Sequence, residues 1–101
     1  MPWFIKTETF TRETAALTIE QKRPHLEAHR QWVMSQCNRG RRIHSGYLVD
    51  DEHRPGGGGL LIFEASSFEE AHRWVQADPM LQAGLVTWQL QQWIQIGGDE
   101  L

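Results

Sequence analysis

Short runs rich in apolar and β-branched residues, some of them alternating with polar residues, predict four β-strands. The first is WFIKTETF (residues 3–10), which is rich in aromatic and β-branched side chains. RRIHSGYLV (41–49) has the same character, and LLIFEA (60–65) is a short, almost wholly apolar run. The last is LVTWQLQQWIQI (85–96). One face of this last strand is expected to carry Val86, Trp88, Leu90, Ile94 and Ile96, with Trp93 on the other.

The segment between the first two strands changes to a helical period. Thr18 and Gln21 match a capping box, and Gly40 stands where helices favour a glycine at their C-terminal end. Pro24 removes a backbone donor, which favours a regular start near Arg23 after a loose first turn. The buried stripe of this helix is expected to contain Leu26, Val33 and Cys37.

A second helix is predicted between the last two strands. Ser67 and Glu70 repeat the helix-start pattern. Asp78 and Pro79 end the helix, because proline disfavours helical geometry in the residue before it. The apolar stripe is expected to contain Phe68, Ala71, Trp74 and Val75.

The order βαββαβ predicts one α+β domain over residues 1–101, with a ferredoxin-like antiparallel sheet and two helices on one face. One layer of helices covers only one face of a sheet. Residues 60–63 are nevertheless apolar on both faces, and Trp93 points away from the helices. We therefore expect two subunits to pack sheet against sheet as a homodimer.

Composition narrows the partners and the location. The formal net charge is −3 and no long basic run is present, which argues against a nucleic-acid partner. The single cysteine, Cys37, fits a reducing compartment and a small buried side chain. With no signal-like or membrane-spanning apolar run, we expect a cytoplasmic protein with no membrane partner. PGGGG (55–59) lacks the lysine and hydroxyl residue of a phosphate-binding loop, which favours a flexible hairpin connection.

Histidines are the first candidates for chemistry. His25 and His29 lie four residues apart, so they can share one helix face and bind a metal. His44, His53 and His72 could complete such a site. The sequence lacks the glutamate that follows the first histidine in zinc proteases, so we expect no metal or other cofactor, although a metal on the pair stays an alternative.

His29 is also a candidate general acid or base. At about 100° per residue it falls roughly 60° from the centre of the expected stripe, at the edge of the core. In this topology Asp78 could approach it from the end of the second helix. A carboxylate on one imidazole nitrogen would fix the tautomer and leave the other nitrogen for a substrate. The alternatives are a histidine that only packs and an aspartate that only ends a helix.

Several stretches occur together in this order: HLEAHRQWV in the first helix, Gly40, Ser45-Gly46 at the end of a strand, GGGGLLIFEA, SFEEAHRWVQ and ADPMLQAGLV. In combination they resemble the YciI-like, or YCII-related, family. The resemblance covers most of the chain. It selects His29 rather than His25 as the family histidine, and Asp78 as its aspartate.

The resemblance implies a dimeric α+β barrel, built from ferredoxin-like subunits, with an active site on a histidine–aspartate pair. Similar proteins often carry arginine where this chain has Leu26, so an anion-binding role would move to Arg23. Most members of the family have no known reaction. The broader group of dimeric α+β barrels includes small enzymes that act on cyclic organic compounds.

Two functions follow from these residues. The first is a cofactor-independent lyase, isomerase or hydrolase in which His29 exchanges a proton with a small, cyclic or carbonyl-bearing substrate. Asp78 would orient the histidine, with Arg23, Ser45 and Trp88 around the substrate. The alternative is a non-catalytic module that binds a small molecule or a protein in the same cleft.

Overall fold

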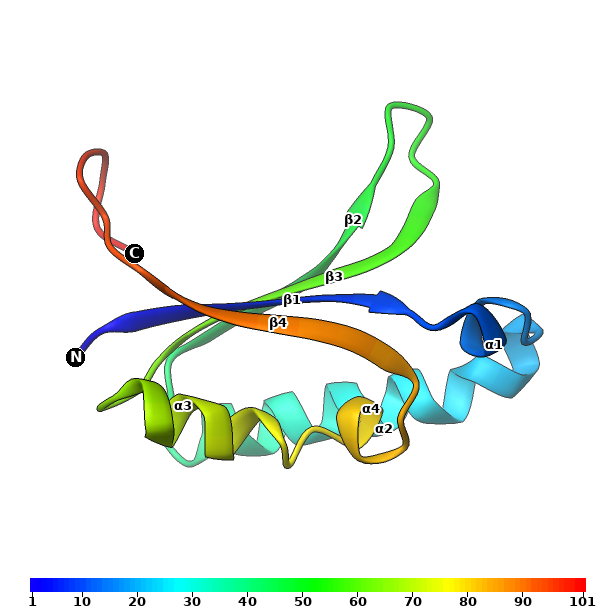
Figure 1. Cartoon of the computed structure of the whole chain (residues 1–101), viewed down its shortest axis with the longest axis horizontal. Helices are drawn as coiled ribbons and strands as arrows, with labels where there is room; N and C mark the ends of the chain where they lie inside the picture. Colours follow the sequence, from blue (N-terminus) through cyan, green and yellow to red (C-terminus); the bar gives the residue numbers. More distant parts are fainter.

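A computed structural model describes residues 1–101, and of Gly57 we describe only its place in a strand. Four strands form one antiparallel sheet in the order β2-β3-β1-β4, the ferredoxin-like order (Figure 1). The strands are β1 (Trp3–Phe10), β2 (Ile43–Val49), β3 (Pro55–Glu64) and β4 (Val86–Trp93). The fold class predicted from the sequence is therefore confirmed for the subunit.

Three of the helices, α2, α3 and α4, lie on one face of this sheet, and α1 lies beyond the end of β1 (Figure 1). They are α1 (Arg12–Ala15), α2 (Ile19–Asn38), α3 (Phe68–Val75) and α4 (Pro79–Gln82). The one-turn helices α1 and α4 were not predicted, because four residues are too few to show a helical period. Among the described residues, no helix combines the length and the apolar character needed to cross a membrane.

Helix α2 begins earlier than the sequence indicated. Thr18 caps it through a complete capping box with Gln21, and Pro24 lies inside the helix, where it is exposed to solvent. The cap therefore outweighs the proline. The predicted stripe was also wrong in part, because Leu26 is 46% exposed and Cys37 is exposed too.

The side of α2 that is turned inward is largely polar, and this explains the error. None of its side chains is fully buried. The half-buried positions instead follow a mixed stripe: Lys22, His25, His29, Trp32, Val33 and Gln36. His29 therefore lies within the inward stripe of α2 rather than at its edge.

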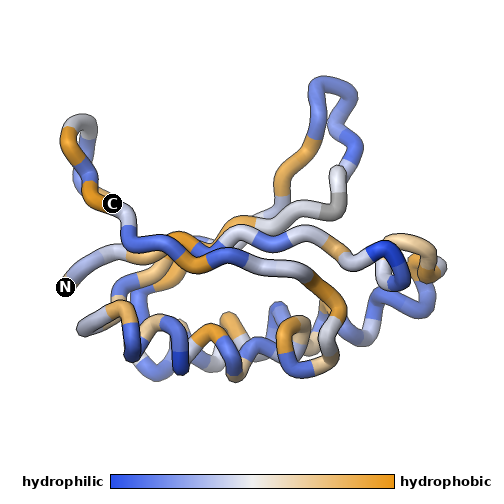
Figure 2. Tube along the Cα trace, in the orientation of Figure 1, coloured by the Kyte–Doolittle hydropathy of each residue, from blue (hydrophilic) through white to orange (hydrophobic). Residues whose placement is uncertain are grey.

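The glycine run belongs to β3 rather than to a flexible connection. Gly58 pairs with Thr9, and Gly59 pairs with both Glu8 and Tyr47. Glycine is a strong turn signal, but inside a strand it also marks a site where a neighbouring group approaches closely. The β2–β3 turn that remains is short and hydrophilic (Figure 2).

The hydrophobic core lies between the sheet and the helices. Phe4 of β1 and Leu61 and Phe63 of β3 meet Ala71 and Val75 of α3, and all five are at most 1% exposed. Strand β4 ends at Trp93, so the predicted last strand was too long. Beyond it Ile94 and Ile96 are 71% and 98% exposed.

The opposite face of the sheet carries apolar side chains that no helix covers. Alternation along the strands puts Trp3, Ile5, Leu60, Ile62 and Trp93 on this open face. All five are half-buried within the subunit. The open face has the composition that the sequence predicted, and the structure contains one subunit.

Candidate active site

Asp78 is held at the start of α4. Its backbone is extended, Pro79 follows at the first helical position, and its Oδ1 accepts a hydrogen bond from the Met80 amide at 2.9 Å. Aspartate is a favoured N-cap and proline a favoured first residue, so the Asp-Pro pair starts a helix here as well as ending the segment before it. The side chain is fully buried.

His29 reaches Asp78 from α2. Its Nδ1 lies 2.9 Å from Oδ1 of Asp78, across 49 residues of sequence. The ring lies 6.3 Å from that of Trp32, which packs on Trp74 at 4.7 Å and so joins the histidine to the core. The side chain of His29 keeps 21% of its surface exposed. One nitrogen is therefore engaged by the carboxylate while the ring remains open to solvent.

Lys6 of β1 completes the site, and the sequence analysis missed it. Its side chain is fully buried, and its Nζ lies 2.8 Å from Oδ2 of Asp78 and 2.9 Å from Oε1 of Glu8. Phe4, Lys6, Glu8 and Phe10 share the helix-facing side of β1, and charges on a core-facing strand must be paired when buried.

Lys6, Glu8, His29 and Asp78 form a charged cluster, and its electrostatics keep Asp78 ionised. Burial alone would raise the pKa of Asp78. The hydrogen bond from His29, together with the charge and the hydrogen bond of Lys6, outweighs burial and lowers this pKa below its ordinary value. An ionised carboxylate only accepts hydrogen bonds, so Nδ1 of His29 carries a proton. In the neutral ring Nε2 is then unprotonated and able to accept a proton.

The other residues predicted for the site lie differently. Trp88 is half-buried on β4 and pairs directly with Glu8, which places it beside the charged cluster. Arg23 is exposed on α2, and Ser45 is exposed on β2 opposite Leu61. No hydrogen bond or ion pair joins Arg23 or Ser45 to the cluster within the described part of the chain.

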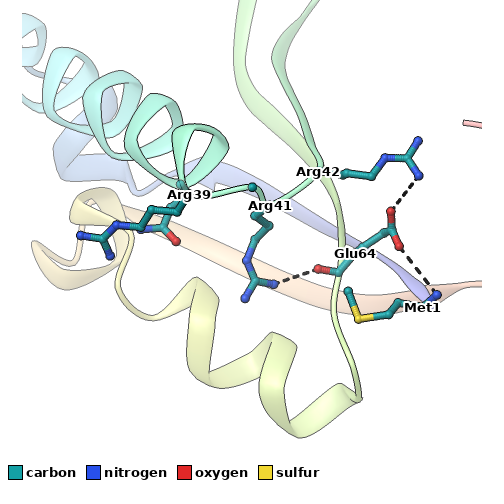
Figure 3. Close-up of a pocket in the computed structure, with 7 residues that line it drawn as sticks. Met1, Arg39, Arg41, Arg42 and Glu64 are labelled. Carbon is teal, nitrogen blue, oxygen red and sulfur yellow. Dashed lines mark hydrogen bonds and ion pairs between the residues drawn. The ribbon is translucent and has the colours of Figure 1, made fainter.

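Two hollows on the surface are lined by residues other than His29. One, of about 400 Å³, is lined by Arg39, Arg41, Arg42 and Glu64, among others (Figure 3). Arg41 pairs with Glu70 at 3.1 Å, and Arg42 pairs with Glu64 at 2.9 Å, so their charges are already balanced. The other, of about 380 Å³, is lined by residues of all four strands, among them Glu8, Gly59 and Trp88. Neither hollow is lined by His29 or Asp78.

The structure does not group residues for a metal. No cluster of three or more histidine, cysteine, aspartate or glutamate side chains is placed to bind a metal ion, as far as the described residues go. Lys6 forms ion pairs with both Asp78 and Glu8. A metal ion bound by these carboxylates would have to replace the ammonium.

Comparisons with known proteins agree with this architecture. The model of the YCII-related domain matches residues 6–93. No curated protein matches the chain. Among solved structures, the chain is similar to 5-chloro-2-hydroxyhydroquinone dehydrochlorinase from Burkholderia phenoliruptrix AC1100, in complex with 2,5-dihydroxybenzoquinone. The TM-score is 0.61 at 23% identity, over 91% of this chain and 93% of the other.

Proposed function

Because the chain belongs to the YCII-related domain family, we propose that it is a small enzyme whose His29 transfers a proton to or from a small cyclic or carbonyl-bearing substrate. The observation that carries the proposal is the contact between Nδ1 of His29 and Asp78 at 2.9 Å, on a ring that is 21% exposed. A histidine that only packs needs no buried, ionised partner on one nitrogen.

The chemistry follows from the two nitrogens of the ring. Nε2 removes a proton from a C–H or O–H group of the substrate, and the imidazolium that forms is stabilised by Asp78. The proton then returns to another atom of the substrate or leaves with the product. Lys6 and the Met80 amide hold the two oxygens of Asp78, so this carboxylate orients the ring and does not itself attack the substrate. The proposal invokes no cofactor.

Hydroxylated rings are the first substrates to test. The similar solved structure is named as a dehydrochlorinase of a chlorinated hydroxyhydroquinone. Elimination of hydrogen chloride needs a base that takes up a proton while chloride leaves, and a neutral Nε2 can do this. We propose Trp88 as an apolar wall for such a ring, while contributions of Arg23 and Ser45 stay predictions from the sequence.

Turnover of 5-chloro-2-hydroxyhydroquinone, followed as chloride release, tests the proposal. His29→Ala and Asp78→Asn should each lower kcat by about a hundredfold or more, while the variants stay folded. The matched control is His53→Asn. His53 lies in the β2–β3 turn at φ 66, a conformation that asparagine tolerates. If His29→Ala retains full turnover, the mechanism is wrong. If the wild type and His29→Ala both bind the compound and neither releases chloride, the site only binds this ring.

We propose further that two copies associate through the open face. The half-buried Trp3, Ile5, Leu60, Ile62 and Trp93 form an apolar surface of the kind that a second sheet covers. Light scattering should give twice the subunit mass, and Ile62→Lys should give the mass of one subunit. A wild-type protein with the mass of one subunit would contradict this. A cytoplasmic location stays a prediction, to be tested by fractionation of cells.

A further inference from the structure

Glu8 is the one member of the charged cluster besides His29 that reaches solvent. Its side chain is 12% exposed, whereas those of Lys6 and Asp78 are fully buried. Its Oε1 forms an ion pair with the Lys6 ammonium at 2.9 Å. Within the described residues no hydrogen bond engages its other oxygen, and no buried side-chain oxygen lacks a partner, so this oxygen has access to solvent. It can therefore accept a hydrogen bond from a ligand.

The fold leaves space for this side chain at Gly59. Gly59 lies directly opposite Glu8 in the sheet, and a Cβ atom added there would lie 3.2 Å from Cγ of Glu8. That separation is tighter than ordinary van der Waals contact, so a larger residue would displace the Glu8 side chain. Gly46 is a useful contrast, because a Cβ added there meets nothing within 4 Å. Gly59 of β3 thus provides the space that the Glu8 side chain occupies.

Glu8 lies on β1 between two residues that side chains of α2 reach directly or through Asp78. Lys22 of α2 lies 5.4 Å from the ring of Phe10, at one end of β1. Seven residues on, His29 reaches Lys6 through Asp78. Glu8 lies between Phe10 and Lys6 on the same face of β1. Glu8 therefore lies along β1 between the contact made by Lys22 and the one relayed from His29 through Asp78, and Trp88 flanks it in the sheet.

We propose that Glu8 binds a hydroxyl group of the substrate while His29 moves the proton, an inference that rests on the proposed function. The Glu8 carboxylate accepts a hydrogen bond from the hydroxyl group, Lys6 fixes the position of the carboxylate, and Gly59 provides the space for it. With a neutral His29, the two carboxylates and one ammonium give the cluster a net charge of −1. The substrate class is therefore a neutral hydroxylated ring, and a carboxylate on the ring is disfavoured by repulsion.

Binding of small ring compounds tests this without turnover. Hydroquinone offers two hydroxyl donors, its dimethyl ether offers none, and 4-hydroxybenzoate adds a carboxylate. Dissociation constants are measured from the amide NMR signals of Glu8 and Gly59. In the wild type hydroquinone should bind about tenfold or more tightly than the ether, because a hydrogen bond to a charged group is lost. 4-Hydroxybenzoate should also bind more weakly than hydroquinone.

Variants assign the preference to Glu8. Glu8→Met is unbranched and cannot accept the bond, so its ratio of hydroquinone to ether affinity should fall to near one. Glu8→Gln keeps an acceptor for Lys6, so its affinity ratio should fall between those of the wild type and Glu8→Met. This second variant keeps the test valid if the methionine variant folds poorly. Gly59→Ala should also lower the ratio. Gly46→Ala, and Glu13→Gln in the exposed first turn of α1, should not.

Failure of the inference can be told from failure of the proposed function. The inference is overturned if hydroquinone leaves the Glu8 and Gly59 signals unmoved, if the wild type does not prefer it, or if Glu8→Met keeps the preference. His29→Ala should keep the preference and lose turnover. If His29→Ala keeps both, the proton-transfer role of His29 fails while hydroxyl binding by Glu8 stands.

Discussion

Replacing Lys6 with methionine should strongly destabilise the protein. Methionine keeps the unbranched shape of the side chain but removes the cation that contacts both Asp78 and Glu8. Asp78 is fully buried, so its charge would lose a partner at 2.8 Å without gaining water. Breaking a buried pair in this way costs about 3–5 kcal/mol. The free energy of unfolding of a small domain is only about 5–15 kcal/mol, so this loss would be easy to measure.

Urea unfolding, followed by the fluorescence of the five tryptophans, measures this cost. A double-mutant cycle with Asp78→Asn separates the pair from the rest of the site. The double variant should be more stable than the summed single effects predict, by about 1.5 kcal/mol or more. Lys22→Met is the matched control, because Lys22 is the only other lysine and contacts the Phe10 ring. It should cost about 1 kcal/mol at most.

Two results would refute the reasoning. One is a Lys6→Met variant within about 1 kcal/mol of the wild type. The other is additivity of Lys6→Met and Asp78→Asn within about 0.5 kcal/mol, the range found for sites that do not interact. Either result would mean that the ammonium and the carboxylate do not depend on each other in the folded protein.

Three further predictions concern pH, β3 and α2. The pKa of Asp78 is lowered in the folded state, so its stabilisation is complete above the ordinary aspartate range and is lost as pH falls through the folded-state pKa. Acid titrations of unfolding should show a flatter pH dependence in Asp78→Asn, and an unchanged one would contradict this. Gly59→Ala should lower the free energy of unfolding by about 1 kcal/mol relative to Gly46→Ala, because Glu8 must move; equal urea midpoints would count against it. Pro24→Ala should raise the melting temperature, because it restores a backbone hydrogen-bond donor inside α2 at an exposed position, a gain of about 1 kcal/mol or more. A lower melting temperature would contradict this prediction.

The fold could be predicted because its signals are local. The strand periods and the capping patterns at Thr18 and Ser67 were enough to give the order of the main elements. The errors arose where tertiary contacts decide. Gly59 suits a strand because the Glu8 side chain lies over it, and Leu26 is exposed because polar residues take the inward side of α2. Short helices such as α4 depend on one cap and have no period to detect.

The site could be predicted only in part, for a related reason. His29 and Asp78 were selected by topology and by the family resemblance, and the structure brings their side chains together. Lys6 was missed because the alternation along β1 is equally compatible with Lys6 and Glu8 facing the solvent. Which face of β1 is buried depends on the register with β3 and β4, and sequence alone does not fix that register.

The protonation of the His29 ring is the most direct test of the account. Nitrogen-15 NMR of the histidine rings, recorded at alkaline pH where imidazoles are neutral, distinguishes a proton on Nδ1 from one on Nε2. The contact with an ionised Asp78 predicts that Nδ1 of His29 carries the proton, that Nε2 is bare, and that Asp78→Leu abolishes this preference. A neutral His29 with its proton on Nε2 would leave no base facing the substrate and would contradict the proposed mechanism.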